Sequence, residues 1–198
     1  YLDYFRNTKV LSAFSLVSTV VSLAIAGVTV PLSKRFGKKE VSAAATCFSG
    51  VAYLILYFMH ITSAWLYMIL SVIGFLGVNL FNMVIWANIT DVIDDHEVRT
   101  GSRDDGTVYS VYSFARKIGQ ALAGGLGGAA LQAIGYDELA TVQNARVVEG
   151  IYATVNLIPA VCFLGVAAIL AFAYPLSRKK VEENAAILKK KREMEQRS

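Results

Sequence analysis

Five long apolar segments, separated by short polar connections, make up most of this chain. They cover roughly residues 10–32, 41–59, 64–90, 107–135 and 150–174. A helix needs about 20 mainly apolar residues to cross the hydrocarbon core of a bilayer, and each segment is near or above that length. The pattern therefore predicts an all-α integral membrane protein, in which residues 10–174 form a bundle of five transmembrane helices.

The composition also favours a membrane protein. Hydrophobic residues make up 55% of the 198 residues and charged residues only 17%, with a mean hydropathy of +0.49. Charged residues are about a quarter of an average soluble domain, and a soluble domain of this size could not bury so much apolar surface. The net charge of +4 lies mostly in a basic tail at residues 175–198 and gives no reason to expect a nucleic-acid partner.

The basic residues of the connections predict the orientation. One side of the predicted bundle carries four of them in residues 33–40, two in residues 91–106 and eight in the tail, whereas the other side carries only Arg6, Lys9 and Arg146. Lys and Arg accumulate on the cytoplasmic side of membranes. We therefore expect a multi-pass protein of the cell inner membrane or plasma membrane, with the acidic segment and the C-terminus in the cytoplasm.

A charged segment, DVIDDHEVRTGSRDDG at residues 91–106, lies between the third and fourth apolar segments and is expected to be a cytoplasmic loop. One hypothesis is a cytoplasmic gate, in which its charged groups pair with another helix bundle. Its candidate residues are Asp91, Asp94, Glu97, Arg99 and Arg103, with Asp95 and Arg99 at the spacing of a helical ion pair. The other hypothesis is a site for Mg²⁺ and a diphosphate, since carboxylates bind divalent cations. The neighbouring arginines argue against a metal, and none is expected.

Lys117 is the most informative single residue of the apolar segments. It lies about ten positions into the fourth segment, or some 15 Å deep at ~1.5 Å per residue, which is near the midplane. A cation at that depth is costly unless it is paired or hydrated, and Ser113 shares its helical face. We expect both to line a cavity that binds substrate, with Lys117 coupling a cation. In the alternative, Lys117 extends to the membrane surface beside Arg116.

Three residues of the third apolar segment, Asn79, Asn82 and Trp86, fall on one helical face. Amides suit sugar hydroxyls because each offers donors and an acceptor, and an aromatic ring suits the apolar face of a pyranose. They are therefore candidate substrate-binding residues. The alternative is that the asparagines bond to a neighbouring helix.

Residues 91–106 resemble the signature of the glycoside–pentoside–hexuronide:cation symporters, a family of the major facilitator superfamily. That signature is roughly D-x-x-D-Y-x-E-x-x-T-G-x-R-x-E-G. The chain supplies Asp91, Asp94, Glu97, Thr100, Gly101, Arg103 and Gly106, and it has Asp95 in place of the usual Tyr and Asp105 in place of the usual Glu. The segment FARKIGQALAGG also places Lys117 where members carry a lysine in helix eleven.

The resemblance implies that the chain is the C-terminal helical bundle of a twelve-helix transporter. Residues 1–9 would be the end of a truncated helix seven and an external loop, followed by helices eight to twelve. The implied function is sugar:cation symport by alternating access, with a small-molecule sugar, Na⁺ or H⁺ as coupling ion, and the N-terminal six-helix half and the bilayer as partners. Some members place a tryptophan of helix ten against the sugar, and here Asn82 falls at about that position.

The resemblance implies no enzyme and no cofactor beyond the coupling ion. Two other functions are weighed against symport. The aspartates alone would suit an intramembrane Mg²⁺-dependent prenyltransferase, but that enzyme would need a second aspartate motif, and the other connection on that side is basic. A non-transporting scaffold or sensor with the same fold is the third possibility.

Overall fold

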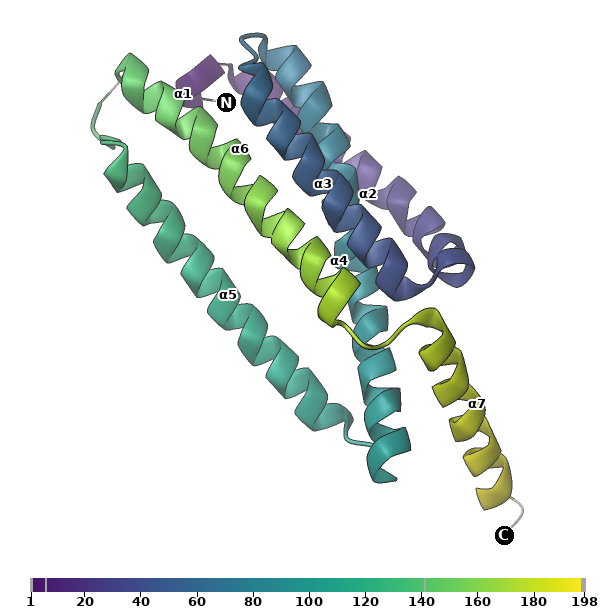
Figure 1. Ribbon diagram of the computed structural model, residues 1–198. Helices are drawn as coiled ribbons and strands as arrows, with labels where there is room; N and C mark the ends of the chain where they lie inside the picture. Colours follow the sequence, from purple (N-terminus) through teal and green to yellow (C-terminus); the bar gives the residue numbers. More distant parts are fainter. Residues whose placement is uncertain (1, 6, 141, 197–198) are drawn as a thin grey trace.

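The computed structural model describes residues 2–5, 7–140 and 142–196, and these form helices without any strand (Figure 1). This confirms the all-α prediction. The helices are α1 (Leu2–Phe5), α2 (Thr8–Phe36), α3 (Lys38–Met59), α4 (Ala64–Thr100), α5 (Asp105–Ala133), α6 (Ala145–Ala168), the π-helical turn η1 (Ile169–Ala173) and α7 (Arg178–Glu195).

Four of the five predicted spans are helices long and apolar enough to cross a membrane: α2, α3, α4, and α6 together with η1. The fifth predicted span corresponds to α5, which is 29 residues long and therefore long enough. Its glycines and glutamines, together with Arg116 and Lys117, make it less apolar than the other four. Four spans are thus supported by length and composition, and the fifth stays a prediction for α5.

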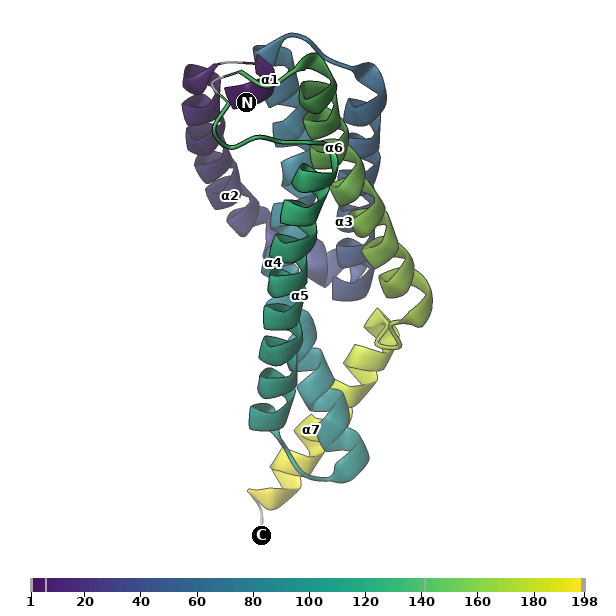
Figure 2. The same ribbon diagram turned by 90° about the vertical axis from the view of Figure 1, so that its left-hand side faces the viewer.

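Helix α3 packs between α4 and α6 (Figures 1 and 2). The buried face of α3 consists mainly of small residues, which let helix backbones approach closely in membranes. Ser49 donates a hydrogen bond of 2.8 Å to the carbonyl oxygen of Gly74, and Gly77 lies directly against the Ala45 backbone, where no Cβ would fit. Small side chains and interhelical hydrogen bonds, among them that of Asn88 to Ser42 at 2.9 Å, therefore fix α3 against α4.

One end of the bundle is closed by an aromatic cluster. The Tyr152 hydroxyl donates to the Leu56 carbonyl oxygen at 2.6 Å and accepts from the Ile61 amide at 3.1 Å, which ties α6 to the connection between α3 and α4. Tyr4 and Phe5 of α1 pack against this cluster. Their rings lie 4.7 Å from Tyr152 and 5.1 Å from Tyr67, respectively.

At the other end, the expected loop at residues 91–106 is mostly helix, which corrects the sequence interpretation. Helix α4 continues as far as Thr100, because Asp91, Ile93 and Asp95 are buried against neighbouring elements and hold it there. Within residues 91–106, only residues 101–104 lie outside a helix. The acidic segment is therefore a rigid extension of α4 followed by a short turn.

A further boundary differs from the sequence interpretation. Pro31 lies inside α2, which continues to Phe36, and the chain then turns at Gly37 with φ 97°, a conformation that favours glycine. The basic tail forms the 18-residue α7, which packs against the extension of α4 (Figure 2).

Candidate functional site

The charged connections and the tail meet at one end of the bundle. The Lys38 ammonium pairs with the Asp91 carboxylate at 2.6 Å, and Lys39 donates to the Tyr174 carbonyl oxygen at 2.7 Å. The tail joins the same end, since Lys191 donates to the Gly101 carbonyl oxygen at 2.9 Å. Residues 33–40, the acidic segment and α7 therefore lie on one side of the molecule, as the predicted topology requires.

Arg103 is the centre of this charged end. Its guanidinium lies 2.9 Å from Asp94, 3.2 Å from Glu97 and 2.9 Å from Asp105. The hydrogen bonds with Asp94, and then with Asp105 and Glu97, raise the pKa of the guanidinium above its already high usual value. A planar fork of donors is the group best suited to bridge several carboxylates, so Arg103 ties α4 to the start of α5.

The turn between α4 and α5 is built to present Arg103. Gly101 ends α4 in the left-handed region at φ 77°, and its N–H donates to the Glu97 carbonyl oxygen at 2.9 Å. Asp104 caps α5 by accepting from the Thr107 amide at 3.0 Å. Hydrogen bonding by the Thr107 side chain, and then by its amide, lowers the pKa of the Asp104 carboxyl. Gly101 ends α4, and Asp104 caps the start of α5 three residues later. This short turn places Arg103 over the acidic face of α4.

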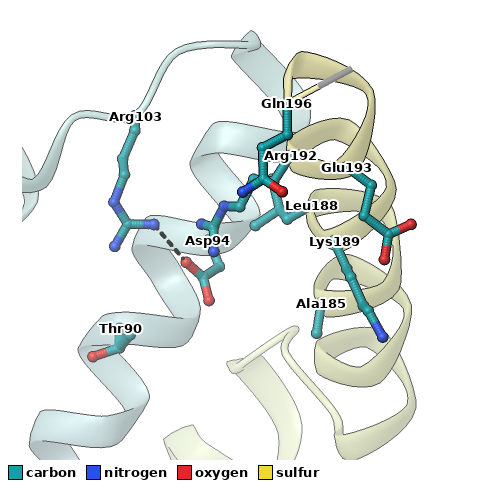
Figure 3. A pocket seen from close by; sticks show the side chains of 9 residues that line it. All are labelled: Thr90, Asp94, Arg103, Ala185, Leu188, Lys189, Arg192, Glu193 and Gln196. Atoms are coloured by element: carbon teal, nitrogen blue, oxygen red, sulfur yellow. Dashed lines mark hydrogen bonds and ion pairs between the residues drawn. The ribbon is translucent and has the colours of Figure 1, made fainter.

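The tail helix α7 shares one carboxylate with Arg103. Glu97 lies 3.6 Å from Lys191 and 3.8 Å from Arg192, in addition to its contact with Arg103. Below these contacts, the Asn184 side-chain amide donates to Asp95 at 2.9 Å in a buried position, and Leu188 is 3% exposed. A groove of about 680 Å³ remains between α4 and α7, with Asp94 and Arg103 on one wall and Arg192 on the other (Figure 3).

The predicted gate residues thus find partners within this chain. Asp91 pairs with Lys38 of α3, Asp94 and Glu97 pair with Arg103, and Arg99 pairs with Asp95 at 2.8 Å, at the predicted helical spacing. Pairing of these residues with another helix bundle stays a prediction. The acidic residues face three different elements, and no group of three or more potential metal ligands occurs in the part of the chain that the structure describes.

The two asparagines of the predicted sugar-binding face have different surroundings. Asn79 accepts a hydrogen bond of 2.9 Å from the Ser22 hydroxyl of α2 and donates to the Phe75 carbonyl oxygen, so it bridges two helices. This favours the helix-bonding alternative for Asn79. Asn82 is exposed and donates only to its own helix, at the Val78 carbonyl oxygen, which leaves it accessible to a ligand.

Trp86 belongs to a cluster that the sequence analysis missed. Its ring packs against the Tyr112 ring at 5.4 Å in an edge-to-face arrangement, and the Arg116 guanidinium lies 5.9 Å from the ring centre. Tyr112 and Arg116 are four residues apart and therefore share one face of α5. That spacing was visible in the sequence, but nothing in the sequence showed that this face meets Trp86.

Lys117 and Ser113 are exposed on α5, next to the face that meets Trp86, and the structure does not bring them into contact with the asparagines. The depth of Lys117 in a membrane stays a prediction. Because α4 extends to Thr100, α5 begins beyond the end of the bundle, and its neighbour Arg116 lies level with Trp86, about 7.5 Å along α4 from Asp91. Lys117 therefore lies on α5 near the level of Trp86 on α4.

Comparisons with known proteins agree with these features. A family model described as MFS/sugar transport protein matches residues 1–178. A Bacillus subtilis protein described as the uncharacterized symporter YjmB is 38% identical over 74% of this chain and 31% of its own length. A putative sulfoquinovose importer of Escherichia coli is 31% identical over 91% of this chain and 38% of its own length.

A glucuronide carrier protein homolog of Escherichia coli is 29% identical over 99% of this chain and 43% of its own length. This chain therefore spans less than half the length of these three relatives. No solved structure matches it.

Proposed function

This chain belongs to the family of MFS/sugar transport proteins, and we propose that it is the C-terminal half of a sugar:cation symporter that works by alternating access. Membership confirms the resemblance to the glycoside–pentoside–hexuronide:cation symporters and identifies a membrane transporter, not an enzyme. The Mg²⁺-dependent prenyltransferase is thereby set aside. Cation coupling, the missing half and the cytoplasmic location of the charged end are parts of the proposal.

The observation that carries the proposal is the folding of the signature segment around Arg103. The acidic positions of the signature at Asp94, Glu97 and Asp105 are all within 3.2 Å of its guanidinium. The segment also contacts α3 through Asp91 and α7 through Glu97. A network of charge pairs joining several helices at one end of a bundle can exchange partners without breaking packed cores, which is what a gate requires.

The exposure of α5 supports a missing N-terminal half as partner. No described residue of α5 is buried, although its glycines offer a surface on which helices can pack closely. Two bundles that rock about a central site are the common design of these transporters, with the site at the interface between the halves. We therefore place the face of α5 that carries Lys117 at that interface.

In the proposed cycle, the chain performs no covalent chemistry. Sugar and cation bind between the halves when the charged end is closed. As they bind, Lys117 changes from one carboxylate partner in the other half to another. The carboxylates around Arg103 then change partners, and the charged end opens to the cytoplasm. The excess of basic residues at this end favours a cytoplasmic location.

The acidic sugars are the first substrates to test. Glucuronides carry a carboxylate and sulfoquinovose a sulfonate, and these are the compounds named in the descriptions of two relatives. We propose the same class of compounds, sugars with an acidic substituent, for the transporter that contains this chain.

Uptake into vesicles tests the proposal. The complete polypeptide that contains this chain would be reconstituted, and uptake of a radiolabelled glucuronide would be measured with a Na⁺ gradient, with a proton gradient and with neither. We expect one of the gradients to drive accumulation of the sugar. Uptake that no gradient changes would refute coupling, and binding of the sugar without any uptake would favour the scaffold or sensor.

A further inference from the structure

A cation and an aromatic ring face each other across α4 and α5. The Arg116 guanidinium lies 5.9 Å from the centre of the Trp86 ring, and the edge-to-face contact of Tyr112 with the same ring holds the indole in place. Asn82 lies one turn from Trp86 on α4 and is exposed. One guanidinium, one indole and one exposed amide thus lie on an open face of the bundle.

Arg116 differs from three arginines of the charged end, which are paired with carboxylates. Arg99, Arg103 and Arg178 each form an ion pair of 2.8 to 2.9 Å with an acidic side chain. Arg116 forms none within the described residues, although it lies farther inside the bundle than the charged end. Cations within membrane-spanning helices are costly unless they are paired with an anion or hydrated.

The geometry leaves Arg116 ready to bind an anion. A guanidinium held over an aromatic face is stabilised by the cation–π interaction and keeps its planar fork of N–H donors available. Such a fork binds the two oxygens of a carboxylate, or two of a sulfonate, in a bidentate manner. The exposed edge of Trp86 and the Asn82 amide are then close enough in the fold to contact the ring and hydroxyls of the same sugar.

We propose that Arg116, positioned by Trp86 and Tyr112, recognises the acidic substituent of the transported sugar and so selects acidic over neutral sugars. This proposal rests on the proposed function. It assigns to Arg116 a role different from that of Lys117, which is exposed on the adjacent face of α5 and is proposed to couple the cation.

The test compares two ligands that differ in one group. The complete polypeptide, as the natural protein and as the variants Arg116→Gln and Arg116→Lys, would be titrated with a phenyl glucuronide and with the corresponding phenyl glucoside. We expect Arg116→Gln to weaken glucuronide binding at least tenfold and to change glucoside binding less than twofold. Arg116→Lys keeps the charge but loses the fork, so it should recover part of the lost affinity.

The outcomes separate this inference from the proposed function. If Arg116→Gln weakens both ligands equally, the residue supports the fold or pairs with the rest of the polypeptide, and the inference is wrong. If it weakens neither, Arg116 is only a membrane-surface anchor, and the inference is equally wrong. If the natural protein binds and transports no sugar at all, the proposed function itself fails. Thermal unfolding of each variant checks that the fold is retained.

Discussion

At the scale of single residues, the ion pair between Lys38 and Asp91 is the most buried charge pair of the charged end. The Asp91 side chain is 6% exposed, and the ammonium lies 2.6 Å away. Replacing Lys38 with Met would leave a buried carboxylate without its cation, which typically costs about 3 kcal/mol. We expect a lower unfolding temperature in detergent. Burial raises the pKa of the Asp91 carboxyl, so the loss should be larger at neutral pH, where the carboxylate is charged, than in acid, where it is protonated.

The matched control for this variant is Lys34→Met. Lys34 is exposed and forms no ion pair within the described residues, so the same change in chemistry should leave the unfolding temperature nearly unaltered. Equal effects of the two substitutions would show that Asp91 is stabilised by something other than Lys38.

Some contacts of single side chains can be predicted from the sequence, and others cannot. The helical ion pair of Asp95 and Arg99 follows from spacing alone, and the structure confirms it. The contact of Arg116 with Trp86 depends on how α4 and α5 are aligned, which no local pattern specifies. For the same reason, the sequence could not decide between a ligand and a neighbouring helix as the partner of Asn79.

At the scale of elements, α7 is the least expected helix, and its attachment can be tested. Leu188 is 3% exposed at the contact with the rest of the charged end, whereas its neighbour Ile187 is 48% exposed. Leu188→Glu would bury a carboxylate and lose roughly 2 kcal/mol of apolar burial, so we expect α7 to detach. Hydrogen exchange of residues 178–195 should then become fast, while exchange of α3 stays slow.

Ile187→Glu is the control, because the same change at an exposed position should leave the exchange of α7 as it is in the natural protein. If both variants exchange alike, Leu188 does not hold α7. If Leu188→Glu also accelerates exchange in α3, the tail would be part of the bundle core and not an attached helix.

The elements that the sequence predicted best are those whose apolar segment is long enough to cross the hydrocarbon core of a bilayer. Helices α2, α3, α4 and α6 were therefore predicted. The end of α3 at Met59 and the start of α4 at Ala64 agree with the predicted segments, whereas the C-terminal ends of α2 and α4 do not. The extension of α4 to Thr100 depends on the burial of Asp91 and Asp95 by partners distant in sequence. Charge alone suggested a loop there, because an isolated run of carboxylates has no reason to be helical.

At the scale of the whole molecule, the network around Arg103 should set the balance between two conformations of the complete transporter. Arg103→Ala removes contacts to three carboxylates and leaves their charges facing one another. We expect the inward-open state to gain several-fold in population, with sugar affinity in the open state nearly intact. Labelling of cysteines introduced at the charged end would measure the shift.

The control is Arg146→Ala. Arg146 is exposed at the opposite end of the bundle and forms no ion pair within the described residues, so its replacement should not shift the labelling. Loss of sugar binding in Arg103→Ala with unaltered labelling would contradict a gate and would place Arg103 in the binding site.

The last prediction concerns which face of the molecule meets water and which meets lipid. Ser113 of α5, Cys47 of α3 and Cys162 of α6 are all exposed in this chain. If the other half covers α5 across an aqueous cavity, a cysteine at position 113 should ionise and react with a hydrophilic maleimide. The native cysteines should face lipid, where the thiolate does not form, and should stay unreactive.

Bound sugar adds a second criterion to this experiment. In the variant Ser113→Cys, saturating glucuronide should slow labelling several-fold, because the sugar occupies the cavity that the reagent must enter. The native protein is its own control, since its two cysteines report only the outer surface. Labelling of Cys47 or Cys162 at the rate of the introduced cysteine would mean that α3 and α6 also line water, and the assignment of α5 to the interface between the halves would lose its basis.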